Sequence, residues 1–383
     1  MDAFRVISPG SFTTVQDKGR YSFIDRGVPP SGVLDPYAYR IANLLVGNPV
    51  NAAVLEITVM GPALEVLGEA DVALTGAHMA VTVNQTAAPM WQTIRLSKGD
   101  VIRIRQAKSG CRSYLAVTGG IDVPPVMGSR ATCVKARIGG VEGRALRKDD
   151  VLARLPAEPL ARLRTLPADL IPSYLPEIVL RAIAGPQEEV FASGLETFFG
   201  EVYEVTSEAD RMGYRLQGPP VHHDEGFPQS IISEPTVPGN VQLPADGQPI
   251  ILLVEQTTGG YTKIATVIST DLSKIAQAVP GNRVRFQRVT LEEAHGFYRE
   301  QARLLPAAGG AQHDGLQRHG QHVALQVRKG RGSLSYRWAE LVSAEVRLAA
   351  GSRRVTDRAH LVYDAARHNW NEVFWILFDP PLA

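Results

Sequence analysis

The sequence has two cysteines, almost no net charge and no long apolar run, and each shortage excludes a class of protein. Cys111 and Cys133 are the only cysteines among 383 residues, too few for a disulfide framework or a Cys-x-x-Cys zinc or redox site. Lys and Arg number 40 against 39 Asp and Glu, so we expect neither nucleic acid nor a membrane surface as partner. The longest apolar runs, such as residues 250–254 and 373–378, are far shorter than a bilayer span. With no signal peptide either, these absences predict a cytoplasmic protein.

Several signatures of nucleotide-binding and hydrolytic proteins are also missing. The sequence has no Gly-Lys pair for a Walker A loop, no Gly-x-Gly-x-x-Gly, no Gly-x-Ser-x-Gly and no His-Glu-x-x-His. His222 and His223 are adjacent and precede Asp224, but consecutive residues of a strand point to opposite faces. We therefore expect a solvated loop there and predict no metal site.

What the sequence does contain is a series of short extended segments. Hydrophobic residues make up 44% of the chain, enough for a large core, and 35 Gly and 26 Pro punctuate it. Extended patterns occupy residues 81–83, 101–105, 114–117, 177–182, 250–254, 264–268 and 284–289. Helical patterns are few: residues 36–46, with Asp35 as N-cap, then 270–278 and 291–305. The predicted fold is mainly β with a few short helices, built as barrels or sandwiches.

The distribution of proline divides the chain. Five prolines and no strand pattern fall in residues 155–176, which is typical of a linker. We predict a β-rich subdomain at 1–155, a linker at 156–176, a second β-rich subdomain at 177–300 and an extension at 301–383. The extension is rich in Arg and His. It is predicted to be a poorly structured tail, with an appended small module or a non-selected reading frame as alternatives.

The strongest local motif lies between the extended segments 250–254 and 264–268, where it predicts a hairpin connection. Its two glycines leave backbone N–H groups uncovered, and its Thr and Tyr hydroxyls add hydrogen-bonding groups that suit a carboxylate, carbamate or phosphate. An ordinary tight turn is the alternative. The residues are Gln256, Thr257, Thr258, Gly259, Gly260 and Tyr261.

Arg211 and Arg215 flank Gly213, and planar guanidinium groups suit carboxylate or phosphate binding. A surface ion pair with Asp210 or Glu208 is the alternative. Glu56 lies within an apolar strand, facing outward or buried against an arginine.

Further polar residues lie in loops that are costly to order unless they pack or bind something. They are Gln16, Asp17, Ser31, Ser233 and Gln242.

In their order along the chain, these motifs resemble the allophanate-hydrolase-subunit-2 (KipA) family over about residues 4–300. The segments that carry the resemblance are 8–10, 13–20, 27–32, 35–36, 43–49, 55–57, 117–121, 127–130, 143–146, 185–187, 210–216, 233–235, 238–244 and 257–267. Two positions depart from the family pattern: Thr262 replaces a proline, and Val254 stands where the family commonly has Asp, which alters the approach to the loop.

The resemblance implies β-rich subdomains with a cyclophilin-like barrel and a KipI-like partner protein. It favours the C subunit of an ATP-dependent 5-oxoprolinase, which with subunits A and B (the B subunit being the KipI-like one) opens 5-oxoproline to glutamate. A biotin-dependent carboxyltransferase subunit, with carboxybiotin as substrate, is the second reading, and a non-catalytic KipA-like regulator that binds a KipI-like protein is the third. Because this chain has no recognisable ATP-binding or biotin-acceptor segment, ATP or biotin would be bound largely by partners.

For either reaction we expect Arg211 and Arg215 to bind an anionic group and the 257–260 tip to donate hydrogen bonds to an oxyanion. Tyr261 would position or relay a proton, and Asp17 or Glu56 would be the base. Replacing Arg211 by Ala is expected to reduce turnover and leave the fold intact.

Overall fold

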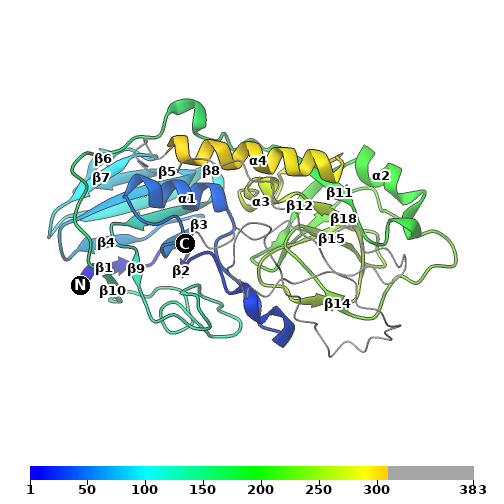
Figure 1. Ribbon diagram of the computed structural model, residues 1–383, viewed down its shortest axis with the longest axis horizontal. Helices are drawn as coiled ribbons and strands as arrows, with labels where there is room; N and C mark the ends of the chain where they lie inside the picture. The colour runs from blue at the N-terminus through cyan, green and yellow to red at the C-terminus, as the bar shows by residue number, and fades with distance from the viewer. Residues whose placement is uncertain (309–383) are drawn as a thin grey trace, which may run out of the picture. The chain divides into compact units, whose positions relative to one another are not determined.

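Strands make up most of the regular structure in the computed structural model, which describes residues 1–308 (Figure 1). They form a ten-stranded sheet, a closed barrel and a small two-stranded sheet. A mainly β fold with a few short helices and a closed barrel is therefore confirmed. The predictions made for residues 309–383 lie outside the described residues.

The ten-stranded sheet uses the first part of the chain. Its strands are β1 (Asp2–Ser8), β2 (Phe12–Gln16), β3 (Val54–Thr58), β4 (Ala63–Val66), β5 (Ala70–Val83), β6 (Thr86–Ala88), β7 (Thr93–Leu96), β8 (Val101–Val117), β9 (Ile121–Asp122) and β10 (Val151–Arg154). The order β2-β3-β8-β4-β1-β10-β9 is extended by β5, which pairs with β6, β7 and β8. The predicted segments 81–83, 101–105 and 114–117 are pieces of the long strands β5 and β8. The β5–β8 register shifts between Gly76 and Val81, and such irregularities break the alternation by which a strand is recognised.

The barrel uses the later strands, in the order β11-β18-β15-β16-β13-β12-β19. Their bounds are β11 (Glu177–Ala184), β12 (Val202–Ala209), β13 (Gly213–Gln217), β15 (Asn240–Leu243), β16 (Ile250–Leu252), β18 (Thr262–Val267) and β19 (Arg283–Arg288). A parallel pairing of β11 with β19 closes it. Rings of Phe198 and Phe286 stack in its core with centroids 4.2 Å apart.

The predicted hairpin over residues 250–268 is wrong. Strand β15 lies between β16 and β18 and pairs with both, so these two strands are not neighbours. The segment between them instead forms β17 (Thr258–Gly259), which pairs with β14 (Glu234–Pro235) as the two-stranded sheet. The short distance between the two strands in the sequence favoured the hairpin. In the structure, β15, which lies earlier in the chain, occupies the edge of β16 at which β18 would have paired.

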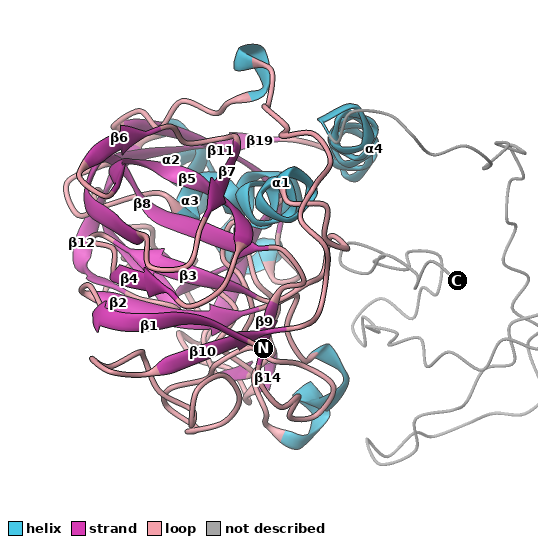
Figure 2. Cartoon of the chain, turned by 90° about the vertical axis from the view of Figure 1, so that its left-hand side faces the viewer, coloured by secondary structure: helices cyan, strands magenta, loops and turns pink. Residues whose placement is uncertain are grey.

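Three helices lie where the sequence predicted them, and a short helix at residues 194–200 was not predicted. Helix α1 (Pro36–Leu45) begins at Asp35, whose Oδ1 accepts a hydrogen bond from the Ala38 N–H at 3.0 Å, as an N-cap should. The others are α2 (Gly194–Gly200), α3 (Leu272–Ala276) and α4 (Leu291–Ala308), with 3-10 turns η1 (Tyr21–Arg26), η2 (Ala168–Leu170), η3 (Glu188–Phe191) and η4 (Ser269–Asp271). Helix α4 lies against α1 (Figures 1 and 2) and also contacts η4. Residues 155–176 contain η2 and no named strand.

Buried polar side chains join the ten-stranded sheet to the barrel. The Gln277 Oε1 atom accepts hydrogen bonds from the N–H groups of Cys111 and Arg112 at 3.0 and 2.9 Å. The Arg112 guanidinium donates to the Tyr214 hydroxyl at 2.5 Å. These contacts make the two sheets parts of one packed unit.

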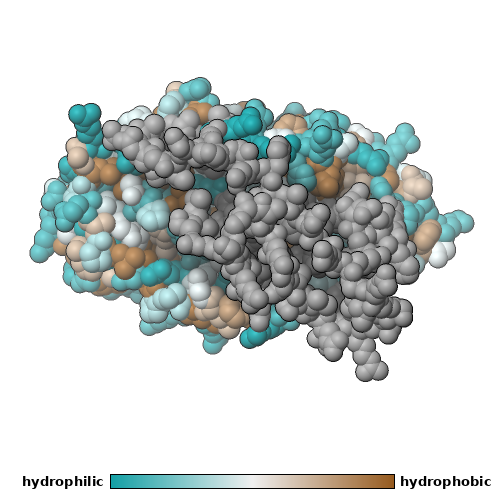
Figure 3. Space-filling view, viewed as in Figure 1, coloured by the Kyte–Doolittle hydropathy of each residue, from teal (hydrophilic) through white to brown (hydrophobic). Residues whose placement is uncertain are grey.

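The helices and the visible surface of the described residues can be compared with the needs of a membrane span. Within residues 1–308, no helix combines the length and the apolar character needed to cross a bilayer. On the coloured parts of the face drawn in Figure 3, hydrophobic residues form small separate groups among hydrophilic ones.

Candidate substrate-binding site at one end of the barrel

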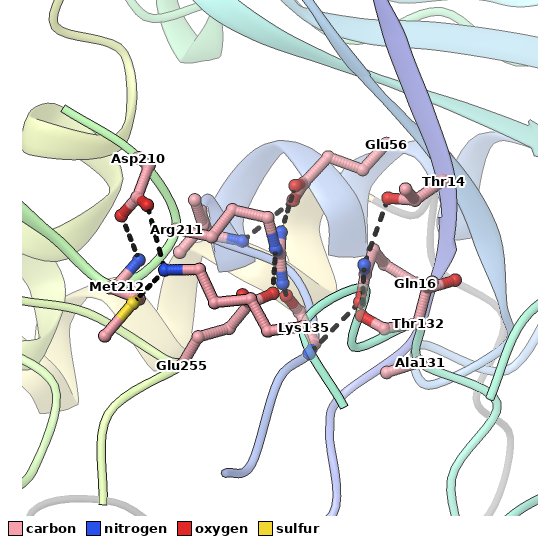
Figure 4. A network of polar contacts seen from close by, with 12 residues as sticks. Thr14, Gln16, Glu56, Ala131, Thr132, Lys135, Asp210, Arg211, Met212 and Glu255 are labelled. Atoms are coloured by element: carbon pink, nitrogen blue, oxygen red, sulfur yellow. Dashed lines mark hydrogen bonds and ion pairs between the residues drawn. The ribbon is translucent and has the colours of Figure 1, made fainter. Parts of the chain in front are cut away.

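Arg211 lies at the centre of a buried charge network (Figure 4). It forms an ion pair with Glu56 through Nη1 and one with Glu255 through Nε, the latter at 2.6 Å. The second Glu56 oxygen accepts hydrogen bonds from the Leu34 N–H at 3.0 Å and the Tyr114 hydroxyl at 2.9 Å. The network joins β3 of the sheet to the loop before β13 of the barrel.

The sequence left open whether Glu56 faces outward or is buried against an arginine. Glu56 is 1% exposed and pairs with Arg211, so it is the buried partner of an arginine. Burial lowers the pKa of Arg211, but the Glu56 and Glu255 carboxylates more than offset this, so that the pKa lies above its usual value. Both oxygens of Glu56 are engaged. Glu56 therefore holds Arg211 in place. It has no free carboxylate oxygen for its predicted role as a base.

Asp17 and Gln16 bind neighbouring loops. The Asp17 carboxylate accepts hydrogen bonds from the Ser129 hydroxyl and the Arg130 N–H, both at 2.6 Å. Gln16 is 0% exposed, and its Oε1 accepts a hydrogen bond from the Gly32 N–H at 3.1 Å. These contacts stabilise the loops around β2, and Asp17, like Glu56, remains only a predicted base.

Arg215 lies apart from Arg211, in a groove of about 420 Å³ that Gln256 also lines. It pairs with Asp246 and, at 3.8 Å, with Glu208. The structure thus separates the two arginines that the sequence suggested as one anion clamp.

A single segment, residues 254–261, contacts the buried Arg211 network, the groove beside Arg215 and the loop that contains Ser31. The Val254 carbonyl accepts a hydrogen bond from the N–H of the fully buried Ser31 at 2.9 Å. Glu255 pairs with Arg211, and Gln256 lines the groove. Beyond them the Thr257 carbonyl accepts from the Thr236 N–H at 3.0 Å.

The 257–261 tip lies beside a cluster of polar side chains that we call the Lys263 cluster: Gln187, Glu234, Gln242 and Lys263. Strands β11, β15 and β18 are antiparallel neighbours, so Gln187 just after β11, Gln242 late in β15 and Lys263 early in β18 meet at one end of the barrel. Gln242 is the cross-strand partner of Lys263. Strand β14 brings Glu234 to the same end through its pairing with β17.

The Lys263 cluster is connected by specific contacts. Lys263 is 4% exposed, and its Nζ forms an ion pair with Glu234 Oε1. Gln187 Nε2 donates to the same oxygen at 2.8 Å. A Cβ added to Gly259 would fall on the Gln242 amide, so the glycine allows this close approach. This end of the barrel offers a buried cation, amide groups and a carboxylate, which together suit a small polar substrate.

Ser233 and Tyr261 border the cluster on its outer side. Tyr261 is 42% exposed, and the Ser233 Oγ lies 3.3 Å from where a Gly260 Cβ would be. His223 Nε2 is 2.7 Å from the Thr262 hydroxyl, and burial lowers the pKa of this histidine. Thr262, which departs from the family pattern, therefore has a partner that proline would lack.

Sequence reasoning missed Gln187, Glu234, Lys263 and His223 as site candidates. A lone lysine in an extended segment is typical of a solvent-facing residue. The family resemblance was an available signal, because the segments 185–187, 233–235 and 257–267 that carry it contain Gln187, Glu234 and Lys263. The adjoining 257–261 motif was a second signal for Lys263, which lies two positions beyond it.

Comparisons with known proteins place the chain in a family. Residues 26–288 match the model of the carboxyltransferase domain, subdomain A and B. The chain is 39% identical to the 5-oxoprolinase C subunit of Escherichia coli over 301 residues, covering 78% of this chain and 95% of that protein. This chain therefore belongs to the carboxyltransferase-domain family.

Larger relatives contain the same region. Urea amidolyase of Lachancea kluyveri is 33% identical, over 76% of this chain but only 17% of its own length. The crystal structure of Kluyveromyces lactis urea carboxylase matches with a TM-score of 0.76 and 28% identity, over 90% of this chain and 32% of that one. The chain spans less than a third of either relative.

Proposed function

We propose that this chain is the C subunit of an ATP-dependent 5-oxoprolinase, which acts with subunits A and B to convert 5-oxo-L-proline to L-glutamate. One observation carries the proposal: the chain is 39% identical to the E. coli 5-oxoprolinase C subunit over 95% of that protein, compared with 33% identity to urea amidolyase. The higher identity favours the 5-oxoprolinase subunit.

The Lys263 cluster is consistent with this substrate. 5-Oxoproline carries a carboxylate and a lactam amide, and ring opening needs the lactam oxygen to be activated, for instance by phosphorylation from ATP. An ammonium group and amide donors suit the carboxylate and the developing oxyanion. ATP would be bound largely by the partner subunits.

The test is reconstitution of this chain with subunits A and B, without biotin, and measurement of 5-oxoproline-dependent ATP hydrolysis together with glutamate release. Turnover that disappears when this chain is omitted is the expected result. A well-formed three-subunit complex with no turnover would overturn the proposal.

A carboxyltransferase subunit is the second candidate, favoured by the family model that matches residues 26–288. Here carboxybiotin would be a substrate delivered by a biotin-carrying partner. Carboxyl transfer from carboxybiotin to urea, dependent on this chain, would establish it. Tight binding to a KipI-like protein with no turnover in either assay would instead indicate a regulator.

A further inference from the structure

Two hydrogen-bond donors in the Lys263 cluster converge on one oxygen atom. Lys263 Nζ and Gln187 Nε2 both contact Glu234 Oε1, the amide at 2.8 Å. An ammonium and an amide N–H directed at one carboxylate oxygen are the donor set of a carboxylate receptor.

The receptor half of this arrangement is held by the barrel wall. Gln187 Oε1 accepts a hydrogen bond from the Lys263 N–H at 2.9 Å, which fixes the side-chain amide and directs Nε2 toward Glu234. A Cβ added to Gly185 would fall on the Lys263 carbonyl, so the two chain segments are in close contact. The Gln187 donor is therefore preorganised by a backbone contact that does not involve Glu234, and the Lys263 side chain is confined by its burial.

The Glu234 carboxylate is held by fewer contacts than the two donors. Glu234 belongs to β14, which has two residues and pairs only with the two residues of β17 among the described strands. Its side chain is 34% exposed, compared with 5% for Lys263. Two residues earlier, Ile232 is 94% exposed, so the segment that carries Glu234 has little packing on this side.

Burying the Lys263 ammonium is costly, and an ion pair in such a place adds little stability over apolar residues of similar volume. A buried cation at the end of the 257–261 tip is better explained by a ligand that needs it. Inside a partly desolvated site a fixed ammonium binds an anion more strongly than it would in water.

We propose that Lys263 and Gln187 form a binding site for a small carboxylate ligand, and that the Glu234 carboxylate occupies this site until the ligand displaces it. The proposal deepens the proposed function, since 5-oxoproline is a monocarboxylate, and rests on it only for the choice of that ligand.

The experiment is isothermal titration of the full chain with 5-oxo-L-proline and, separately, with acetate as the bare carboxylate. Glu234→Gln removes the intramolecular competitor, so we expect it to bind both probes about tenfold more tightly, equivalent to about 1.4 kcal/mol. Lys263→Met is expected to weaken binding at least tenfold and to abolish the gain in the double variant. Glu188→Gln is the matched control: its side chain is 33% exposed and pairs with Arg288 on the surface, and its affinity should equal that of the unmodified chain.

The outcomes separate the two proposals. Acetate binding that is strengthened by Glu234→Gln and lost in the Lys263→Met background, without binding of 5-oxoproline, supports the carboxylate site and counts against the 5-oxoprolinase assignment. Glu234→Gln affinity equal to or below that of the unmodified chain overturns the inference. Because Glu234 is partly exposed, Glu234→Gln is expected to fold. If Glu234→Gln has the melting temperature and the acetate affinity of the unmodified chain, the site is rejected, even if Lys263→Met unfolds.

Discussion

The position of Arg211 changes the effect that we expect from its replacement. The sequence suggested that its replacement would leave the fold intact, but its guanidinium neutralises the buried carboxylates of Glu56 and Glu255 and donates to the Gly32 carbonyl at 2.6 Å. Removing one partner of a buried charge network leaves the others uncompensated.

We therefore expect Arg211→Met to lower the free energy of unfolding by about 3–5 kcal/mol, measured by urea denaturation. Arg215→Met is the control, with an expected loss below about 1 kcal/mol, because its side chain is 29% exposed and pairs with carboxylates near solvent. Full stability of Arg211→Met combined with lost turnover would restore the anion-binding role that the sequence suggested.

Asp35 predicts a pH effect. Burial raises the pKa of its carboxyl, although hydrogen bonds from Ala38 and Gln277 oppose the shift. The folded state thus binds this proton more tightly than the unfolded chain, so the contribution of Asp35 to stability falls as pH rises from about 4, the usual value, to the raised folded pKa.

Asp35→Asn keeps an oxygen for the helix cap and removes the titration. The stability of the unmodified chain relative to this variant should decline with rising pH over that window and then level off, as measured by urea denaturation between pH 4 and pH 8. A difference that is constant, or that grows with pH, would contradict the assignment of this shift to Asp35.

At the scale of elements, the β17–β18 connection owes its shape to its contact with β15. Gly259 leaves no room for a Cβ because the Gln242 amide lies there, whereas a Cβ at Gly260 would meet only the Ile231 carbonyl and the Ser233 hydroxyl at 3.3 Å. The two glycines are adjacent but face different constraints.

Gly259→Ala is expected to displace the flexible Gln242 side chain and to reduce turnover of the reconstituted complex about tenfold or more, since small displacements of positioning groups are costly to rate. Gly260→Ala should keep most activity, and both variants should keep their melting temperature within a few degrees. Equal loss in both variants would indicate that the loop needs backbone freedom rather than this one contact.

At the scale of the whole molecule, Gln277 joins the sheet to the barrel. It is 3% exposed, accepts from two backbone N–H groups of β8, and donates to Asp35 and to the Arg112 carbonyl at 2.8 Å each. Such contacts predict that sheet and barrel unfold together.

Calorimetry of the unmodified chain should show one transition for this unit, and Gln277→Ala should lower stability by roughly 2–6 kcal/mol, about 1–3 kcal/mol for each of two N–H groups left unsatisfied. Gln248→Ala is the control, because its hydrogen bonds to Gly218, at 2.8 and 3.1 Å, stay within the barrel. Two separate transitions in the unmodified chain would show that the polar contacts do not couple the sheets.

The sequence by itself determined the β-rich class and features set by neighbours in the chain. Asp35 and Pro36 start α1 because capping needs only a side chain and the N–H three residues on. The dense Gly and Thr content of 257–260 marked a special loop for a similarly local reason.

Only the tertiary structure decided which strands pair and which charges meet. Strand β15 separates β16 from β18, and Lys263 meets Glu234 and Gln187, which lie 29 and 76 residues earlier. Glu56 and Arg211 are 155 residues apart in the sequence and form a buried ion pair in the fold. Such contacts depend on closure of the barrel and its packing against the sheet, and no pattern within a short window of sequence encodes which distant partner arrives.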